Sequence, residues 1–313
     1  MPFWVLSASD LLLSKRTYNA QLRLHFVVFL WGFTAILGDI ISVDSIPLVT
    51  YRMLIAVISI YAFLKFKGVN VAVSGPLRWK LYGAGMIIAL HWITFFHAIK
   101  ISTVSVTLAC IGSGTLFVSI LEPLFFRRKI ALSEVLLGIA VAAGIFTIAN
   151  AETSYINGVI VALISAFLSA LFSVMNGMLV KKSNSAVITV HELFGGWLAI
   201  ALLMIAQLAF GERSVESISL TAKDVGLLIV LGTIATAYAF IESVAVMKEL
   251  SPFTVVLTIN LEPVYGILLA YFLLGDDEKM SPEFYFGALI ILASVLINGY
   301  LKRKQRRRSQ ETS

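Results

Sequence analysis

Long apolar runs, separated by short polar connections, make up most of the chain. Apolar and polar residues do not alternate along these runs, so they are predicted to be helices rather than strands of a membrane barrel. About 20 apolar helical residues cross a hydrocarbon core that is about 30 Å thick. Ten runs are predicted to be spans, at residues 23–41, 46–66, 81–99, 103–126, 132–150, 156–180, 187–210, 223–247, 252–274 and 284–301.

The composition supports a membrane protein and excludes a soluble fold. Of the 313 residues, 59% are hydrophobic and only 13% are charged, whereas soluble domains have about 45–50% apolar and about 25% charged residues. The connections between the runs are too short to hold a second, soluble domain. The predicted fold class is therefore an all-α polytopic membrane protein with ten transmembrane helices.

The net charge of +6 is explained by where the basic residues lie rather than by nucleic-acid binding. With ten spans, 19 of the 24 Lys and Arg residues fall on the side of the two termini, four fall on the other side, and Arg52 lies inside a span. Basic loops stay in the cytoplasm, so both termini are predicted to be cytoplasmic. The basic cytoplasmic tail, residues 302–313, is expected to bind anionic lipid headgroups, and no nucleic-acid partner is predicted.

Residues 1–22 are expected to form a cytoplasmic or interfacial segment. Their apolar part is short and contains Asp10, and the basic residues Lys15 and Arg16 follow it rather than precede it, which argues against a cleavable signal. The chain has a single cysteine, Cys110, so it cannot form an intrachain disulfide. The expected location is a bacterial cytoplasmic (inner) membrane.

The run from 251 to 275 carries Asn260–Pro263 at its centre. Pro263 has no backbone N–H and displaces the carbonyl of Ile259, so the helix is predicted to kink or open there. A carboxylate at the depth of Glu262 costs about 2.5–3.5 kcal/mol on insertion scales unless it is protonated, paired or hydrated. A simple anchor needs neither feature. This stretch is therefore predicted to belong to a functional site, with Asn260 among its residues.

The chain repeats itself with an offset of 148 residues, which aligns 103–127 with 251–275. Each repeat holds five spans, an odd number, so the second half is predicted to cross the membrane in the opposite orientation. Inverted repeats around a mid-membrane site are typical of many secondary transporters. In this alignment the stretch with Pro263 meets Gly112, Ser113 and Gly114, so both halves are predicted to be interrupted at one matched place. Close helix packing is the alternative explanation for the glycines.

Several features together resemble the drug/metabolite transporter superfamily and, more narrowly, two tandem EamA domains. They are the ten spans in two inverted halves, the Trp-Gly pair that begins at Trp31, the Ala-Ile-Lys that ends at Lys100, and the Leu-Gly that ends at Gly275 before acidic residues. On this resemblance, residues 23–150 form the first EamA-like repeat, with helices 1–5. Residues 156–301 form the second, with helices 6–10.

The first repeat departs from the family pattern in two ways. Arg127, Arg128 and Lys129 stand where the family usually has Leu-Gly-Glu, and Glu122 lies late in its span. For this reason no role is transferred from the family to Glu122.

Arg52 lies about six residues inside the second span, at a depth similar to that of Asp39 in the first. It either pairs with Asp39 or extends towards the outer surface. An offset of 140 residues aligns Arg52 with Glu192 in the seventh span. Inverted symmetry then predicts a gate or a cargo contact at both ends of the protein, with solvation of helix ends as the alternative.

His91 and Trp92 lie near the middle of the third span, and Trp31 lies deep in the first. An imidazole at this depth can donate to a solute or exchange protons near neutral pH; a structural bond to a carbonyl is the alternative. The two tryptophans are too deep for the interfacial belt. They are expected to line a cavity and stack on a planar solute, or else to serve in aromatic packing.

The sixth span carries Ser165, Ser169, Ser173 and Gly177 at a spacing of four. Residues at this spacing share one face of a helix, and small side chains let two backbones approach closely. The sequence favours a packing seam over contact with a solute.

No enzyme activity, cofactor or metal site is predicted. His191 and Glu192 begin like a zinc-protease motif, but Gly195 stands where the second histidine belongs. His91 and His97 are six residues apart, so they do not share a face of a helix. The chain has no phosphate-binding loop, and active transport must be coupled to an ion, to exchange or to a separate subunit.

The leading hypothesis is a secondary transporter that exports small organic metabolites by alternating access. Glu262 is its expected coupling or cargo carboxylate, and Asn260, His91 and Trp92 are expected to line the cavity. The expected partners are a small-molecule cargo and protons or another coupling ion, and the intramembrane charges favour an amino acid or amine. The alternatives are an exchanger of phosphorylated sugars or nucleotide sugars, a non-transporting membrane assembly or regulatory protein, and a lipid-modifying enzyme.

Overall fold

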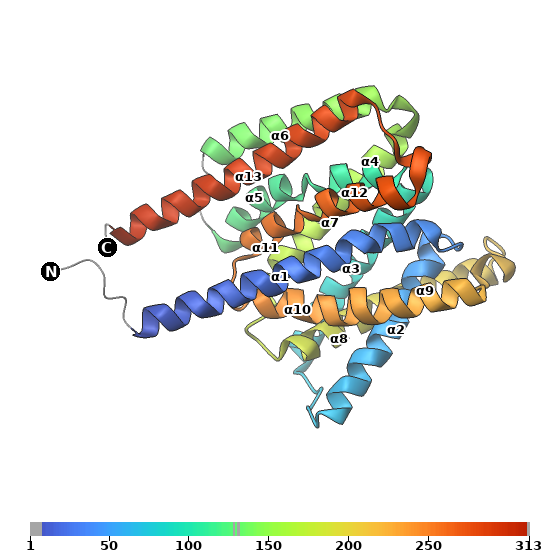
Figure 1. The fold of residues 1–313 in the computed structure, drawn as a ribbon. Helices are drawn as coiled ribbons and strands as arrows, with labels where there is room; N and C mark the ends of the chain where they lie inside the picture. The colour runs from blue at the N-terminus through green and yellow to red at the C-terminus, as the bar shows by residue number, and fades with distance from the viewer. Residues whose placement is uncertain (1–7, 128, 130–131, 312–313) are drawn as a thin grey trace.

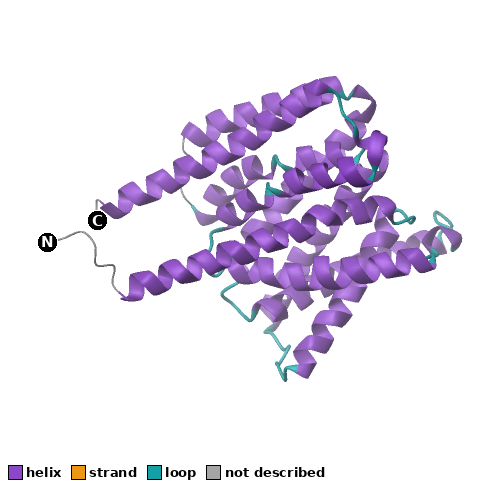
Figure 2. Cartoon of the chain, viewed as in Figure 1, coloured by secondary structure: helices purple, strands orange, loops and turns teal. Residues whose placement is uncertain are grey.

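The computed structural model describes residues 8–127, 129 and 132–311. This part of the chain is helical apart from short turns and loops, and it contains no strand (Figure 2). The first half has α1 (Ala8–Ile40), α2 (Ser45–Phe66), α3 (Gly75–Ile101), α4 (Val104–Ile111), α5 (Gly114–Phe126) and α6 (Leu132–Ala151).

The second half begins after the short 3₁₀ turn η1 (Thr153–Tyr155). It has α7 (Ile156–Leu179), α8 (Ser185–Ala209), η2 (Glu216–Ile218), α9 (Ala222–Gly232), η3 (Thr233–Tyr238), α10 (Ala239–Val246), α11 (Pro252–Ile259), α12 (Glu262–Leu273), η4 (Gly275–Glu278) and α13 (Pro282–Glu311).

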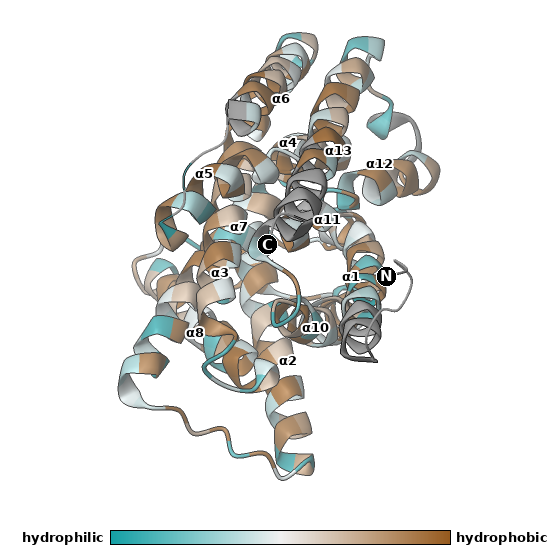
Figure 3. Cartoon of the chain, turned by 90° about the vertical axis from the view of Figure 1, so that its left-hand side faces the viewer, coloured by the Kyte–Doolittle hydropathy of each residue, from teal (hydrophilic) through white to brown (hydrophobic). Residues whose placement is uncertain are grey.

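The predicted all-helical membrane fold is confirmed. Seven helices, counted with their continuations, are long and apolar enough to cross a membrane, and three shorter apolar helices accompany them in the described part of the chain. The protein is an integral, multi-pass membrane protein. Along the helices the ribbon is mostly hydrophobic, and hydrophilic residues gather at the connections (Figure 3). Helix α1 begins at Ala8 and α13 continues to Glu311, so both extend beyond the predicted spans.

Helix α3 lies in the middle of the bundle, where it packs against both α7 and α8. Helices α6 and α13 run side by side as a separate pair on one side of the bundle (Figures 1 and 3). The beginning of α1 and the end of α13 lie at the same end of the molecule (Figure 1). We call this the terminal end, and the opposite one the loop end.

Two spans are interrupted at equivalent places. Helix α4 ends at Ile111 and α5 begins at Gly114, while α11 ends at Ile259 and α12 begins at Glu262. The ends and the starts are each offset by 148 residues, the offset of the sequence repeat. Helix α4 packs against α12, and α5 packs against α11. The half before one break therefore meets the half after the other, which is the contact pattern of two antiparallel segments.

The two interruptions contact each other directly. The amide Nδ2 of Asn260 donates to the hydroxyl of Thr115. A Cβ added to Gly112 would lie 3.9 Å from the ring of Pro263 and 3.1 Å from the carbonyl of Ala109. The backbone at Gly112 has φ −53° and ψ −22°, which is open to any residue, so glycine is needed here for close packing rather than for a left-handed turn.

The eighth predicted span contains a π-helical turn. Helix α9 ends at Gly232, and the chain continues through the π-helical segment η3 into α10. A π turn shifts the register of a helix by one residue and often marks a functional site. Here it directs Ala235 and Thr236 towards the first repeat, as described below.

Two polar contacts join the repeats at the loop end. The carboxylate of Asp224 at the start of α9 accepts from the N–H and the hydroxyl of Ser42, at 2.9 and 2.7 Å. The buried carboxylate of Glu278 accepts from the N–H groups of Val104 and Ser105, at 2.7 and 2.8 Å, and so caps α4. These contacts link the two repeats at the loop end.

Candidate functional site

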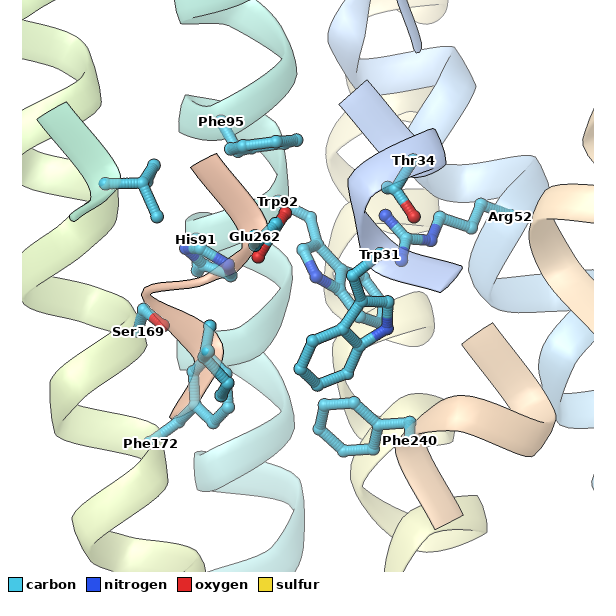
Figure 4. A pocket seen from close by; sticks show the side chains of 12 residues that line it. Trp31, Thr34, Arg52, His91, Trp92, Phe95, Ser169, Phe172, Phe240 and Glu262 are labelled. Carbon is cyan, nitrogen blue, oxygen red and sulfur yellow. The ribbon is translucent and has the colours of Figure 1, made fainter. Parts of the chain in front are cut away.

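A small cavity lies at the place where the two interrupted spans meet α1, α2, α3, α7 and α10. Its volume is about 50 Å³, which has room for a few water molecules, since one water needs about 10–15 Å³. The last residues of α4 and α11, Ile111 and Ile259, both line it. The remaining lining residues are Trp31, Thr34, Arg52, His91, Trp92, Phe95, Ser169, Phe172, Phe240 and Glu262 (Figure 4).

Arg52, on α2, provides the only cationic side chain among the described residues that line the cavity. It is only 1% exposed, and its Nε donates to the hydroxyl of Thr236 at 2.6 Å. That hydroxyl in turn donates to the carbonyl of Leu231 at 2.6 Å. The guanidinium stacks on the ring of Trp92, with Cζ 3.9 Å from the ring centroid. Its Nη1 is buried and has no hydrogen-bond partner, so the arginine retains a donor.

Glu262 supplies the negative charge of the cavity. It is the first residue of α12 and only 7% exposed. Its carboxyl group and the guanidinium of Arg52 interact electrostatically, but no ion pair within 4.0 Å joins these two described side chains. The cavity thus contains one guanidinium and one carboxyl group that are not in direct contact with each other.

His91 links α3 to α7 at the edge of the cavity. Its Nδ1 lies 2.9 Å from the carbonyl oxygen of Ser165, and the hydroxyl of Ser165 donates to the carbonyl of His91 at 3.0 Å. Only a protonated Nδ1 can donate to a carbonyl, so this contact favours the tautomer that leaves Nε2 as an acceptor. The structural alternative for His91 is realised, while its ring still lines the cavity.

Aromatic side chains form one side of the cavity. Trp92 and Phe240 meet edge to face with centroids 5.8 Å apart, and Phe240 lies 6.0 Å from Phe172. Phe172 also lies 5.4 Å from the ring of His91. We call Trp92, Phe172 and Phe240 the aromatic floor; in Figure 4 Phe172 and Phe240 lie together below the charged groups. The Nε1 of Trp31 donates to the carbonyl of Ala235 at 3.0 Å.

The structure brings five of the predicted site residues together: Trp31, Arg52, His91, Trp92 and Glu262. Asn260 and Glu192 lie elsewhere. Asn260, with Pro263 and Gly112, lines a second, largely apolar groove of about 280 Å³ between α4, α12 and α13. Ser113 and Gly114 are buried beside this break, and the hydroxyl of Ser113 has no hydrogen-bond partner.

The sequence-based expectations for Arg52 are both wrong. Its interactions in the described part of the chain do not include Asp39, and it does not extend to the surface. The carbonyl of Asp39 instead accepts from the Nζ of Lys100 at 2.9 Å. Thr236 and the face of Trp92 hold the guanidinium inside the protein, because hydrogen bonding and stacking compensate a buried arginine better than a distant carboxylate.

The sequence did not indicate several residues of the site, among them Thr34, Phe172 and Phe240 in the cavity lining and Thr236 beside Arg52. Thr236 is held by the π turn, which no simple periodicity in the sequence reveals. Ser169 belongs to the serine row of the sixth span, which was predicted to be a packing seam, yet it lines the cavity. Its neighbour Ser165 bonds to the backbone of His91 on α3.

The carboxylates and histidines of the site are too dispersed for a transition-metal centre. Within the part of the chain that the structure describes, no three His, Cys, Asp or Glu side chains gather as metal ligands. The cavity presents a guanidinium, a carboxyl group and three aromatic rings to whatever occupies it.

The sequence matches the profile of the EamA-like transporter family twice, over residues 21–150 and 156–300. No curated protein matches the chain. A solved crystal structure of another protein superimposes with a TM-score of 0.67 at 17% sequence identity, over 91% of this chain and 98% of that chain. At this identity the likeness extends to the fold alone. The two profile matches agree with the two repeats found in the sequence.

Proposed function

Because the chain belongs to the EamA-like transporter family, and so to the transporters of the drug/metabolite type, we propose that it is a secondary transporter of small zwitterionic metabolites. The cargo is an amino acid or a related amine, and the direction is export across a bacterial cytoplasmic membrane. Ten spans in two inverted repeats, with both termini in the cytoplasm, form the transport path.

The observation that carries this proposal is the charge arrangement in the cavity. Arg52 offers an unpartnered guanidinium donor, which suits a carboxylate. Glu262 offers a carboxyl that suits an ammonium group, and the two charges are not in direct contact. The aromatic floor suits the apolar part of the cargo. Because each charge gains a partner only when a zwitterion binds, the site discriminates against solutes that have one charge.

The small volume of the cavity supports alternating access. A space of about 50 Å³ does not hold an amino acid, so cargo entry requires the walls to move. The matched interruptions place a break in two of these walls, and the breaks meet through Asn260 and Thr115. Antiparallel packing of α4 on α12 and of α5 on α11 supports an inverted relation between the repeats, in which the same motion opens either end.

The contacts between the repeats define what must change during transport. At the loop end, Asp224 and Glu278 join the two halves. At the terminal end, Arg23 pairs with Glu242, with Nε 2.6 Å from Oε2. Opening of either end therefore breaks one set of polar contacts and keeps the other.

An exchanger of phosphorylated sugars or nucleotide sugars is disfavoured by the same cavity. A phosphate group needs several basic partners, and Arg52 is the only cationic side chain among the described lining residues.

Protons are the coupling ion that suits Glu262, because a carboxyl group at the membrane centre can bind a proton and the cargo alternately.

Purified protein in liposomes tests the proposal. Vesicles are loaded with a panel of amino acids, amines, carboxylic acids and sugar phosphates, and efflux is measured with and without a proton gradient. We expect efflux of amino acids and related zwitterions, weaker efflux of amines and none of sugar phosphates. Absence of flux for every solute, together with absence of any cargo-induced thermal stabilisation in detergent, would contradict the proposal and favour a non-transporting role.

A further inference from the structure

A second group of buried polar side chains lies between α7 and α8, apart from the cavity. Glu192 on α8 is 0% exposed and Asn176 on α7 is 1% exposed. Asn176 Nδ2 lies 3.5 Å from Glu192 Oε2, at the outer limit for a hydrogen bond. The other oxygen of each side chain, Glu192 Oε1 and Asn176 Oδ1, has no hydrogen-bond partner.

Two more buried hydroxyls lie one helical turn away on the same faces. Ser173 precedes Asn176 by three residues on α7, and Thr189 precedes Glu192 by three on α8; residues at this spacing are neighbours on a helix. Both hydroxyl oxygens are buried without a partner. Four buried oxygen atoms without partners thus lie within one helical turn of the contact between Asn176 and Glu192, and each such atom is costly in a buried place.

We propose that Glu192, Asn176, Ser173 and Thr189 form a binding site for a monovalent cation, namely Na⁺. Hard cations bind carboxylate, amide and hydroxyl oxygens, and these are the groups gathered here. The single carboxylate balances one positive charge, which disfavours a divalent ion. No cationic side chain lies within 4.0 Å of Glu192 in the part of the chain that the structure describes, so the protein supplies no counter-charge of its own.

In the first repeat, the position equivalent to Glu192 carries a basic side chain of the protein itself. Arg52 and Glu192 occupy the same position in α2 and α8, seven residues after Ser45 and Ser185. Thr34 and Ser173 likewise lie at the same distance from the ends of α1 and α7. In the first repeat the guanidinium occupies this place. In the second, a carboxylate stands there and a cation has to come from solution.

A proton alone accounts for fewer of these atoms. Protonation of Glu192 provides one donor and satisfies one acceptor, whereas a bound Na⁺ coordinates several oxygens at once. Helix α3 packs tightly against the backbone of α8 at this residue, because a Cβ on Gly85 would lie only 1.8 Å from the backbone carbonyl oxygen of Glu192.

The position of this site connects it to the cavity. Ser169 and Phe172 line the cavity, and Ser173 and Asn176 follow on the next turn of α7. A cation that fixes α7 to α8 therefore also fixes Phe172 in the aromatic floor. The existence of the site rests on the geometry of α7 and α8, and only its coupling to cargo movement rests on the proposed function.

Thermal unfolding of the purified full chain in detergent tests the site. NaCl is titrated against N-methylglucamine chloride at constant ionic strength, with KCl as a size control. We expect a saturable upward shift of the unfolding temperature with Na⁺ and a much smaller one with K⁺. Retention of radioactive ²²Na⁺ by the purified protein measures the same binding without unfolding.

Three variants test which residues bind the Na⁺. Glu192→Gln keeps the shape and removes the charge, and it should weaken Na⁺ binding at least about tenfold, which corresponds to about 1.4 kcal/mol. Thr189→Val removes one oxygen and should weaken binding by a smaller factor. Glu262→Gln is the matched control in the cavity and should leave Na⁺ binding unchanged. If Glu192→Gln does not fold, Thr189→Val and the comparison of Na⁺ with K⁺ decide.

Several results would overturn the inference. Equal shifts with Na⁺, K⁺ and N-methylglucamine would show that no specific site exists, and undiminished Na⁺ binding in Glu192→Gln would place it elsewhere. Stabilisation by methylammonium but not by Na⁺ would assign the site to the cargo's ammonium group. Specific Na⁺ binding in a protein that moves no solute would contradict the proposed function alone, whereas transport without specific Na⁺ binding would contradict this site alone.

Discussion

The hydrogen bond from Arg52 to Thr236 is the contact through which the π turn should hold the cavity in place. Thr236→Val is nearly isosteric and removes the hydroxyl that accepts from Nε at 2.6 Å and donates to the carbonyl of Leu231. A hydrogen bond to a charged group contributes about 1.5–3 kcal/mol. Neutral bonds between membrane helices average about 0.6 kcal/mol. We therefore expect Thr236→Val to lower the free energy of unfolding by about 1.5–3 kcal/mol.

Thr233→Val provides the matched control on the same π-helical segment. The Thr233 hydroxyl donates to the carbonyl of Ile229 at 2.6 Å and lies on the exposed side of the helix. Its loss should cost under about 1 kcal/mol, because it has no partner on another helix. Reversible unfolding by sodium dodecyl sulfate in mixed micelles measures both variants under the same conditions.

A double-mutant cycle with Arg52→Met isolates the contact itself. In the Arg52→Met background, Thr236→Val should cost no more than Thr233→Val does, which corresponds to a coupling energy of about 1–2 kcal/mol. Replacement of the buried arginine alone is a poor measure, because an apolar residue in its place can be neutral or stabilising. A coupling energy near zero, or equal costs for the two threonine variants in the wild-type background, would refute the role given to Thr236.

Two further predictions concern the packing and the loop end. Gly85→Ala should prevent α3 from approaching α8, since its Cβ would meet the carbonyl oxygen of Glu192 at 1.8 Å, and we expect either no folded protein or a loss of more than about 3 kcal/mol in the free energy of unfolding. The control Gly83→Ala, with nothing within 4 Å of its Cβ, should be tolerated; size-exclusion profiles and unfolding curves compare the two variants. Asp224→Ala removes the carboxylate that accepts from Ser42 and completes the Thr221 capping box, and it should lower the free energy of unfolding by about 2–4 kcal/mol. Asp44→Ala is the control: the Asp44 side chain is 72% exposed, so its loss should lower that free energy by under about 1 kcal/mol. Equal losses in the two aspartate variants would contradict the account of the loop end.

The helices could be read from the sequence because the membrane imposes one rule on every span. Long apolar runs must be helical there, and the structure has helices in each predicted interval. The helix boundary at Pro263 also follows from local chemistry, since proline removes a donor. The matched break near Gly112 was found only through the repeat, because glycine alone is equally compatible with a continuous helix.

The partners of the polar residues could not be read in the same way. Arg52 bonds to Thr236, which lies 184 positions later and reaches the arginine only because a π turn shifts the register. Asn260 turns towards Thr115 rather than into the cavity. Glu192 lies at the position equivalent to Arg52 but on a different pair of helices. In each case the position of the residue along its helix followed from the sequence, whereas the helix that it faces depends on packing between helices distant in sequence.

The most direct test of the central claim is transport by Glu262→Gln in liposomes, compared with wild type and with Glu249→Gln, which changes an exposed carboxylate after α10. Glutamine resembles the protonated carboxyl and cannot release a proton. We predict that Glu262→Gln loses efflux driven by a proton gradient, while Glu249→Gln transports at nearly the wild-type rate. Wild-type efflux in Glu262→Gln, with unchanged dependence on pH, would contradict the assignment of the cavity as the transport site.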